Sequence, residues 1–306
     1  MTDPTGSPPR LSSPKGIIGL LERRGFSFSH RLGQNFLVDP RVLVDIADET
    51  GAGPGDHILE IGAGAGILTA ELARRAAAVA AIELDRRLLE VLGEVLAGQT
   101  NVTVIHGDIL KTDTDAVFAA LEKQAGPPPG VRRVVGNLPY YITTPVMMKL
   151  LEEAPSARHP WATLTVTVQK EVADRLLAGP GGKDYGAITL AVNYYAEARG
   201  GPIIPPGAFR PAPKVSSRVI TLVRREKPPV EADRGLLFKL TRAGFGQRRK
   251  TLANALAALG ADGAFPVLVW ADVLREAGID PRRRAETLSL EEFGALALTV
   301  ERHLTQ

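Results

Sequence analysis

Short apolar runs separated by longer segments of helical periodicity form the most regular pattern in the chain, between residues 57 and 168. Val and Ile are frequent in these runs, as is typical of strands buried in a parallel sheet. The segments between them, such as Leu68–Arg75 and Arg86–Leu96, have the periodicity of helices. This alternation predicts an α/β fold with a doubly wound, mostly parallel sheet. The predicted strands are Ile58–Ile61, Val79–Ile82, Val102–Ile105, Arg133–Val135 and Leu164–Val168.

The two ends of the chain depart from this alternation. Gly16–Arg24 is predicted to be a short capped helix. Tyr185–Glu197 is predicted to be helical, whereas Val215–Val223 is rich in β-branched residues and is predicted to be a late strand at the sheet edge. After a Lys-Pro-Pro break at 227–229, Leu236–Leu259 and the remainder are predicted to be helical.

These breaks divide the chain into three parts. Residues 1–13 are rich in Pro, Ser and Thr and are expected to form a disordered tail. Residues 14–227 are expected to form the α/β domain, and residues 228–306 a small all-α domain. With 306 residues, 44% of them hydrophobic, the chain can build the cores of two domains.

Composition also limits the chemistry. The absence of cysteine excludes disulfides, thiolate nucleophiles and Cys-ligated metals, and it allows a cytoplasmic location. The histidines are scattered, so we expect no metal site. The sequence contains neither a membrane-length apolar stretch nor a secretory signal, so we expect no membrane partner. A net charge of +3 and a pI of about 9.2 allow a polyanionic partner.

A glycine-rich loop, Glu60–Gly66, follows the first predicted strand and opens a helix, where nucleotide-type cofactors bind in such folds. A dinucleotide is one interpretation, because Glu83 ends the next strand at the spacing of a ribose ligand. Two details oppose it. Ile67 stands where the dinucleotide fingerprint has its third glycine, and the charge of Glu60 would repel a pyrophosphate. S-adenosylmethionine, which carries an ammonium and a sulfonium, suits Glu60 better.

Polar side chains end several of the predicted strands. Glu60, Glu83 and Asp108 lie at the ends of the first three, and Asn137 follows the fourth. Because the carboxyl ends of parallel strands meet at one edge of a sheet, we expect these side chains to share one site. Glu83 could bind ribose hydroxyls there, and Asp108 could bind an adenine. Any one of these carboxylates alone could equally be a solvated helix cap or strand end.

Asn137-Leu138-Pro139-Tyr140 is the most informative motif. The N6-amine of adenine is a poor nucleophile, so a methylating site must hold both of its N–H groups with acceptors. The Asn137 side chain and the Leu138 backbone offer two carbonyls, Pro139 stiffens the turn, and Tyr140 offers a face for stacking. A turn built of ordinary turn-forming residues is the alternative.

Together these motifs resemble the ribosomal RNA adenine N6,N6-dimethyltransferases of the KsgA type. The similarity extends from Lys15 to the C-terminus, and motifs this long and in this order are specific. The segments that carry it are Leu32–Leu37, Glu60–Gly66, Ile82–Asp85, Gly107-Asp108, Gly136–Tyr140, Val168–Ala173, Phe209–Val215 and Phe245–Leu252.

The resemblance implies an S-adenosylmethionine-dependent enzyme of ribosome biogenesis that dimethylates two adjacent adenosines in a hairpin loop near the 3′ end of small-subunit (16S) rRNA. It places the target adenine between Tyr140 and Phe209. Ala63 departs from the proline of many relatives, but backbone approach depends on Gly62 and Gly64, so we still expect binding. The implied cofactor contacts are Asn35, Leu37, Gly62, Glu83, Asp108 and Asn137. Gly64 is expected to join them, because it allows close backbone approach.

Basic residues cluster in the helical domain, at Arg248-Arg249-Lys250 and at Arg282–Arg284. We expect residues 248–250 to bind rRNA, because like charges so crowded are destabilising without a polyanion. The Arg282–Arg284 cluster could equally be a solvated helix face. Other candidates for RNA contact are Lys15, Arg23, Arg24, Arg31 and Arg242.

Three alternatives remain open. A large-subunit rRNA adenine methyltransferase of the drug-resistance type would share every pocket motif, although the helical domain and Phe209–Val215 favour the small subunit. A non-catalytic RNA-binding assembly factor would have a decayed pocket, whereas the pocket motifs here are complete. An NAD-dependent dehydrogenase is the least favoured. The small-subunit enzyme is expected to act as a monomer on immature small subunits.

Overall fold

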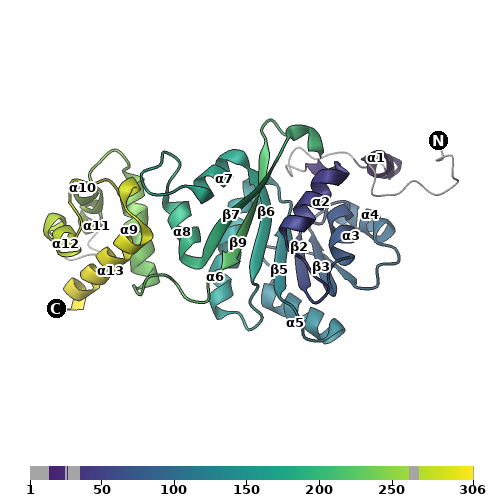
Figure 1. The fold of residues 1–306 in the computed structure, drawn as a ribbon, viewed down its shortest axis with the longest axis horizontal. Coiled ribbons are helices and arrows are strands. Elements are labelled where there is room, and N and C mark those ends of the chain that lie inside the picture. The colour runs from purple at the N-terminus through teal and green to yellow at the C-terminus, as the bar shows by residue number, and fades with distance from the viewer. Residues whose placement is uncertain (1–13, 25, 27–34, 262–268, 306) are drawn as a thin grey trace. The chain divides into compact units, whose positions relative to one another are not determined.

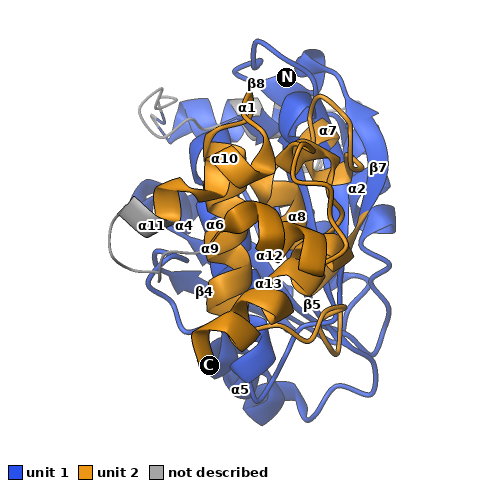
Figure 2. Ribbon diagram, turned by 90° about the vertical axis from the view of Figure 1, so that its left-hand side faces the viewer, with its two compact units in different colours: residues 1–173, 199–224 blue, residues 174–198, 225–306 orange. Residues whose placement is uncertain are grey.

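The computed structural model describes residues 14–24, 26, 35–261 and 269–305. Its chain forms two compact units: unit 1 comprises residues 1–173 and 199–224, and unit 2 comprises residues 174–198 and 225–306 (Figure 2). The junction between 224 and 225 lies close to the boundary expected at 228, and unit 2 also takes in residues 174–198. The tail expected over residues 1–13 lies outside the described residues.

A seven-stranded sheet with the order β4-β3-β2-β5-β6-β9-β7 forms the centre of unit 1 (Figure 1). β2 pairs in parallel with both β3 and β5, so the direction of strand succession reverses at β2. Ligands of doubly wound sheets bind beside such a reversal, at the carboxyl ends of the strands. The predicted α/β class and its five strands are confirmed as β2 (His57–Ile61), β3 (Ala78–Glu83), β4 (Val102–His106), β5 (Arg132–Gly136) and β6 (Thr163–Gln169).

The two late strands differ from expectation. The predicted late strand is present as β9 (Ser217–Arg224), which is antiparallel to β6. The prediction that it forms the sheet edge is wrong. The edge belongs to β7 (Ala196–Ile204), which was not predicted because Gly200-Gly201-Pro202 disfavours a strand. An edge strand tolerates such residues, since its outer N–H groups need no partner strand. The helix predicted over Tyr185–Glu197 is correct for α8 (Ala187–Tyr195) and ends where β7 begins.

Helices cover the sheet of unit 1 and bury its apolar side chains. Val79 and Ala81 lie on one face of β3, where α2 and α3 pack around Val79 and α4 packs on Ala81. α2 begins with Pro40 at its first position, and the Asp39 side chain accepts a hydrogen bond from Arg41 N. The helices are α1 (Pro14–Arg23), α2 (Pro40–Glu49), α3 (Ile67–Ala73), α4 (Leu89–Val95), α5 (Thr114–Ala125), α6 (Tyr140–Glu153) and α7 (Lys170–Leu177), which runs on into unit 2.

A second, two-stranded sheet joins distant parts of unit 1. β1 (Phe36–Leu37) is antiparallel to β8 (Phe209–Arg210), with Leu37 opposite Phe209. Both side chains are buried and belong to the same apolar cluster as Val79. The pairing therefore places the segment before α2 beside the segment before β9.

Unit 2 is helical. Leu237, Leu240, Phe293 and Leu296 are fully buried and form its core. The helices predicted over Leu236–Leu259 are confirmed as α9, α10 and α11, with a non-helical break after Gly246. None of the described helices of the chain is long and apolar enough to span a membrane. Besides α8, the helices of unit 2 are α9 (Arg234–Gly246), α10 (Leu252–Leu256), α11 (Ala258–Ala261), α12 (Trp270–Glu276) and α13 (Leu290–Thr305).

Candidate active site

A pocket in unit 1 opens at the carboxyl ends of β2, β3, β4 and β5, beside the reversal of strand order. The six segments that the sequence predicted to form the cofactor and methylation sites all contribute to its wall. β1 and β8 bring in two of these segments, and the parallel strands bring in the rest. The predicted residues that line the pocket are Asn35, Leu37, Gly62, Gly64, Glu83, Asp108, Asn137, Leu138, Pro139, Tyr140 and Phe209.

The glycine loop turns sharply between β2 and α3. Gly62, Gly64 and Gly66 have φ angles of 72°, 59° and 80°, which residues with a Cβ rarely adopt. A Cβ on Gly66 would also lie 2.8 Å from Leu92 Cδ2, so this glycine is required for space as well. The described residues with positive φ are all glycines, so Ala63, between Gly62 and Gly64, is unstrained and the loop keeps its shape without proline.

Glu83 closes this loop from the neighbouring strand. Its carboxylate accepts hydrogen bonds from Gly64 N and Asp85 N, each at 2.8 Å. Burial raises the pKa of the Glu83 carboxyl, and the backbone hydrogen bonds oppose that shift. Each carboxylate oxygen keeps a further lone pair. Glu83 can therefore shape the loop and still accept hydrogen bonds from a ligand.

Glu60 is the most unusual group in the pocket. It is 2% exposed, and its Oε2 has no hydrogen-bond partner among the described residues. Burial raises the pKa of Glu60 to about 8; the Thr69 hydroxyl lowers it and the charge of Glu83 raises it by smaller amounts. Glu60 is therefore mostly neutral at pH 7 in the free protein. The sequence argument that Glu60 repels a pyrophosphate requires the charged carboxylate. That charged form is favoured only when a cation lies against it.

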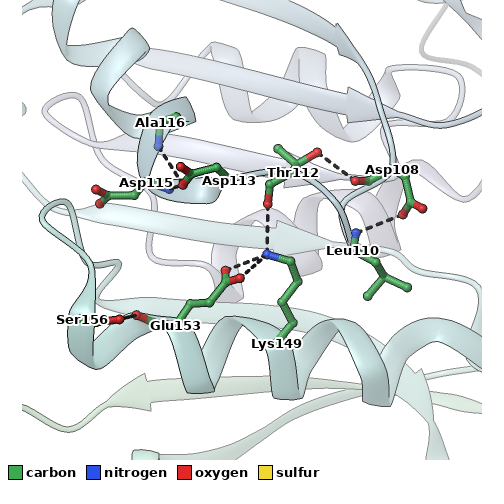
Figure 3. A network of polar contacts seen from close by, with 9 residues as sticks. All are labelled: Asp108, Leu110, Thr112, Asp113, Asp115, Ala116, Lys149, Glu153 and Ser156. Carbon is green, nitrogen blue, oxygen red and sulfur yellow. Dashed lines mark hydrogen bonds and ion pairs between the residues drawn. The ribbon is translucent and has the colours of Figure 1, made fainter.

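Asp108 is the second residue of the loop between β4 and α5. Its Oδ1 accepts a hydrogen bond from Leu110 N at 3.0 Å (Figure 3). Its Oδ2 lies 4.0 Å from the exposed Lys111 ammonium. Gly107 N donates to the main-chain carbonyl of Glu83 at 3.0 Å, which ties the loop to the end of β3. One oxygen of Asp108 thus shapes the loop and the other remains available to a ligand.

The Asn137–Tyr140 turn connects β5 to α6. The Asn137 amide nitrogen donates to the Asn35 carbonyl at 3.4 Å, an orientation that leaves its side-chain oxygen available as an acceptor. Leu138 is buried and packs against Gly136, where a Cβ would lie 3.1 Å from Leu138 Cγ. Pro139, with a φ of −53°, precedes the first residue of α6. The turn is therefore held from both sides.

Three aromatic residues line the pocket near this turn. The Tyr140 hydroxyl lies 2.7 Å from Oγ of Ser217, a buried residue of β9, so the Tyr140 ring is fixed at its far end. Phe209 is only 1% exposed and also packs in the core of unit 1. Tyr141 lines the pocket and is 59% exposed. The sequence motif suggested no contact for the Tyr140 hydroxyl and no role for Tyr141.

The basic cluster in unit 2 separates into two parts. Arg248 forms an ion pair with Glu286 at 3.1 Å and donates a hydrogen bond to the Lys183 carbonyl at 3.0 Å. Arg249 and Lys250 are exposed, and no ion-pair partner for them is found among the described residues. Arg248 therefore holds unit 2 together, whereas its two neighbours are available to a polyanion. In the second cluster, Arg282 and Arg283 pair with acidic residues of unit 2.

The doubly wound sheet, the glycine loop after β2 and the Asn-Leu-Pro-Tyr turn after β5 define a Rossmann-like methyltransferase. Among the described residues there is no cluster of His, Asp and Glu that could hold a metal. The sequence profile of the family described as "Ribosomal RNA adenine dimethylase" matches residues 25–295, and the chain belongs to this family.

Individual relatives agree with that assignment. The chain is 48% identical over 288 residues to "Ribosomal RNA small subunit methyltransferase A" of Geobacillus kaustophilus, covering 94% of this chain and 96% of the relative. The protein of the same name from Alkaliphilus oremlandii is 43% identical over 296 residues, covering 96% and 99%. The chain is therefore a methyltransferase of a family of rRNA-modifying enzymes.

Two solved structures share the fold over 87% of this chain. A dimethyladenosine transferase from Plasmodium falciparum has a TM-score of 0.72 at 26% identity, with 98% of that chain covered. The 23S rRNA methyltransferase ErmE has a TM-score of 0.62, also at 26% identity, with all of that chain covered. The name of the first structure states the modified nucleoside, dimethyladenosine, whereas the name of the second states its substrate, the 23S rRNA of the large subunit.

Proposed function

We propose that this methyltransferase transfers methyl groups from S-adenosylmethionine to the N6-amines of two adjacent adenosines in a hairpin loop near the 3′ end of small-subunit rRNA. The observation that carries the proposal is the Asn137-Leu138-Pro139-Tyr140 turn in the wall of the pocket that also contains Glu83 and Asp108. The names of the Geobacillus and Alkaliphilus relatives support the small subunit. A ribosomal substrate favours a cytoplasmic location, and we propose that the enzyme acts as a monomer.

The pocket residues fit S-adenosylmethionine. Its amino-acid end carries an ammonium, and its sulfonium is also cationic; the unpartnered, buried Oε2 of Glu60 is an acceptor suited to either charge. Glu83 would accept hydrogen bonds from the ribose hydroxyls, and Asp108 from the adenine amine. Gly62 and Gly64 allow close backbone approach, while Asn35, Leu37 and Asn137 complete the wall. When bound, the cofactor supplies an electrophilic methyl group.

The protein's part in the reaction is to position the target amine. The Asn137 side-chain carbonyl and the Leu138 main-chain carbonyl would accept its two N–H groups, so that its lone pair points into the pocket. Tyr140, held by Ser217, would stack on the flipped base, with Phe209 behind it. Positioning can contribute about 7–11 kcal/mol of barrier reduction, so the mechanism needs no general base. The amine loses its proton to solvent after it has become cationic.

A large-subunit substrate is the second candidate, because the ErmE structure shares the fold over 87% of the chain. The test is to offer labelled cofactor in parallel to unmethylated small subunits, to large-subunit RNA and to the bare hairpin. We expect dimethyladenosine at two adjacent positions of the small subunit, with the hairpin a poorer substrate because it presents fewer phosphates. Label on large-subunit RNA alone would favour the second candidate. Cofactor binding without transfer to any RNA would instead favour a non-catalytic assembly factor.

A further inference from the structure

Lys149, on α6, is a mostly buried lysine whose ammonium is fully engaged. Its side chain is 15% exposed. Nζ donates to the two carboxylate oxygens of Glu153 at 2.5 and 2.7 Å and to the main-chain carbonyl of Thr112 at 3.0 Å (Figure 3). An ammonium has three N–H donors, so these three acceptors satisfy it. Lys149 lies outside the motifs that identified the pocket.

Helix stability alone does not explain this pair. Lysine precedes glutamate by four residues, which is the less favourable order on a helix. Glu153 is also the last residue of α6, where the helix dipole disfavours a carboxylate. The arrangement is explained if Glu153 holds the ammonium of Lys149 against the Thr112 carbonyl.

Thr112 lies near the end of the loop that carries Asp108, just before Asp113, the N-cap of α5. Within the loop, the Thr112 hydroxyl and Lys111 N both donate to the main-chain carbonyl of Asp108, each at 2.9 Å. The loop is therefore one compact, internally bonded turn. Its start is tied to the end of β3, and its end is tied to α6 by Lys149. Without Lys149, the loop would be held only by its bond to β3 and by the capped start of α5, so the direction in which the Asp108 carboxylate points would be less well fixed.

α6 begins at Tyr140, directly after the turn that would hold the target amine. A helix rises about 1.5 Å per residue, so Lys149 lies roughly 13 Å further along the same helix. We propose that Lys149 is a positioning residue for the cofactor: it fixes the 108–112 loop so that Asp108 Oδ2 can accept a hydrogen bond from the adenine amine. This inference rests on the proposed function, in which Asp108 binds that amine.

The test compares two ligands that differ at one position. S-adenosylhomocysteine carries the N6-amine, whereas S-inosylhomocysteine has an oxygen there, which a carboxylate repels. By calorimetry, the wild-type enzyme should prefer the adenine ligand by about tenfold or more, as expected for a charge-assisted hydrogen bond. Lys149→Met keeps the apolar stem and removes the ammonium. We expect it to weaken binding of the adenine ligand and leave the inosine ligand almost unchanged, so that the preference falls towards one.

Two further variants keep the result unambiguous. Lys123→Met removes an exposed lysine of α5 and should keep the wild-type preference, which controls for loss of charge. Glu153→Ala removes the carboxylate that holds the Lys149 ammonium against the Thr112 carbonyl, and the Glu153 side chain is 45% exposed, so this variant should fold and lower the preference even if Lys149→Met fails to fold. A wild-type preference in folded Lys149→Met, or in Glu153→Ala if Lys149→Met does not fold, would overturn the inference but leave the proposed function intact. Equal binding of both ligands by the wild type would show that Asp108 does not bind the adenine amine, and it would overturn the inference as well.

Discussion

The nitrogen and the oxygen of the Asn137 side-chain amide have separate roles. Its nitrogen is bonded to the Asn35 carbonyl, and its oxygen is the proposed acceptor for the target amine. We predict that Asn137→Ala lowers the rate of methyl transfer by about 10²–10³-fold, the range found when one oriented group is removed from an active site. Single-turnover transfer to small subunits measures this, with circular dichroism as the check on folding. Wild-type turnover by a folded variant would show that the amine is held elsewhere.

The Tyr140 hydroxyl and Ser217 allow stacking to be separated from anchoring. Tyr140→Phe keeps the ring and removes one hydrogen bond, so it should retain much of the activity, whereas Tyr140→Ala should lose most of it. Ser217→Ala should resemble Tyr140→Phe, at a cost of about 1 kcal/mol in the free energy of unfolding. If the phenylalanine variant were as inactive as the alanine variant while Ser217→Ala stayed active, the hydroxyl would have a direct role in the reaction.

At the scale of elements, the loop between β2 and α3 makes cofactor binding depend on pH. Glu60, near the end of strand β2 before this loop, has a pKa of about 8 in the free protein, and a cation against it would lower that value. Binding of S-adenosylmethionine should therefore release a proton, and its affinity should rise with pH up to about 8 and level off above. Glu60→Gln should remove this dependence. Calorimetry in two buffers of different ionisation enthalpy tests it, and heats that do not depend on the buffer would rule it out.

The same carboxyl group affects stability with the opposite sign. A carboxylic acid with a raised pKa in the folded state binds its proton more tightly when folded than when unfolded. The free energy of unfolding of the cofactor-free protein should therefore fall as pH rises from the ordinary value of 4.5 towards 8. Urea unfolding at several pH values measures this fall, which Glu60→Gln should reduce.

Elements with one clear periodicity were predictable from the sequence, and elements stabilised by their neighbours were not. The five parallel strands are apolar runs between helical segments, so pattern alone located them. β7 contains Gly200-Gly201-Pro202, and only its place at the edge of an existing sheet makes it a strand. Glu83, Asp108 and Asn137 were predictable because the carboxyl ends of parallel strands meet. Leu37 and Phe209, on the antiparallel pair β1–β8, were expected only from the resemblance to a family. The contacts of Tyr140 with Ser217 and of Lys149 with Thr112 depend on packing that no local spacing encodes.

At the scale of the whole molecule, RNA binding should depend on the exposed part of the basic cluster. Arg249→Ala with Lys250→Ala should weaken RNA binding and reduce the slope of log K against log salt by about 1–2, with cofactor affinity unchanged. Arg248→Ala is the matched control. It removes one positive charge of the same cluster and also the contacts with Glu286 and Lys183, so it should lower thermal stability more than the double variant does. A salt slope unaltered in the double variant would make 249–250 an ordinary solvated surface.

The pairing of β1 with β8 determines when the active site can first exist. Leu37, in the wall proposed for the cofactor, and Phe209, in the wall proposed for the base, come from segments far apart in the sequence, and each is the other's partner. A chain is synthesised from its N-terminus, so Leu37 emerges early and remains without its partner strand until Phe209 has also left the ribosome. Contacts of such long range form late and slowly in folding. The active site of this enzyme, which is proposed to act on immature ribosomal subunits, therefore cannot form during most of the enzyme's own synthesis on a ribosome.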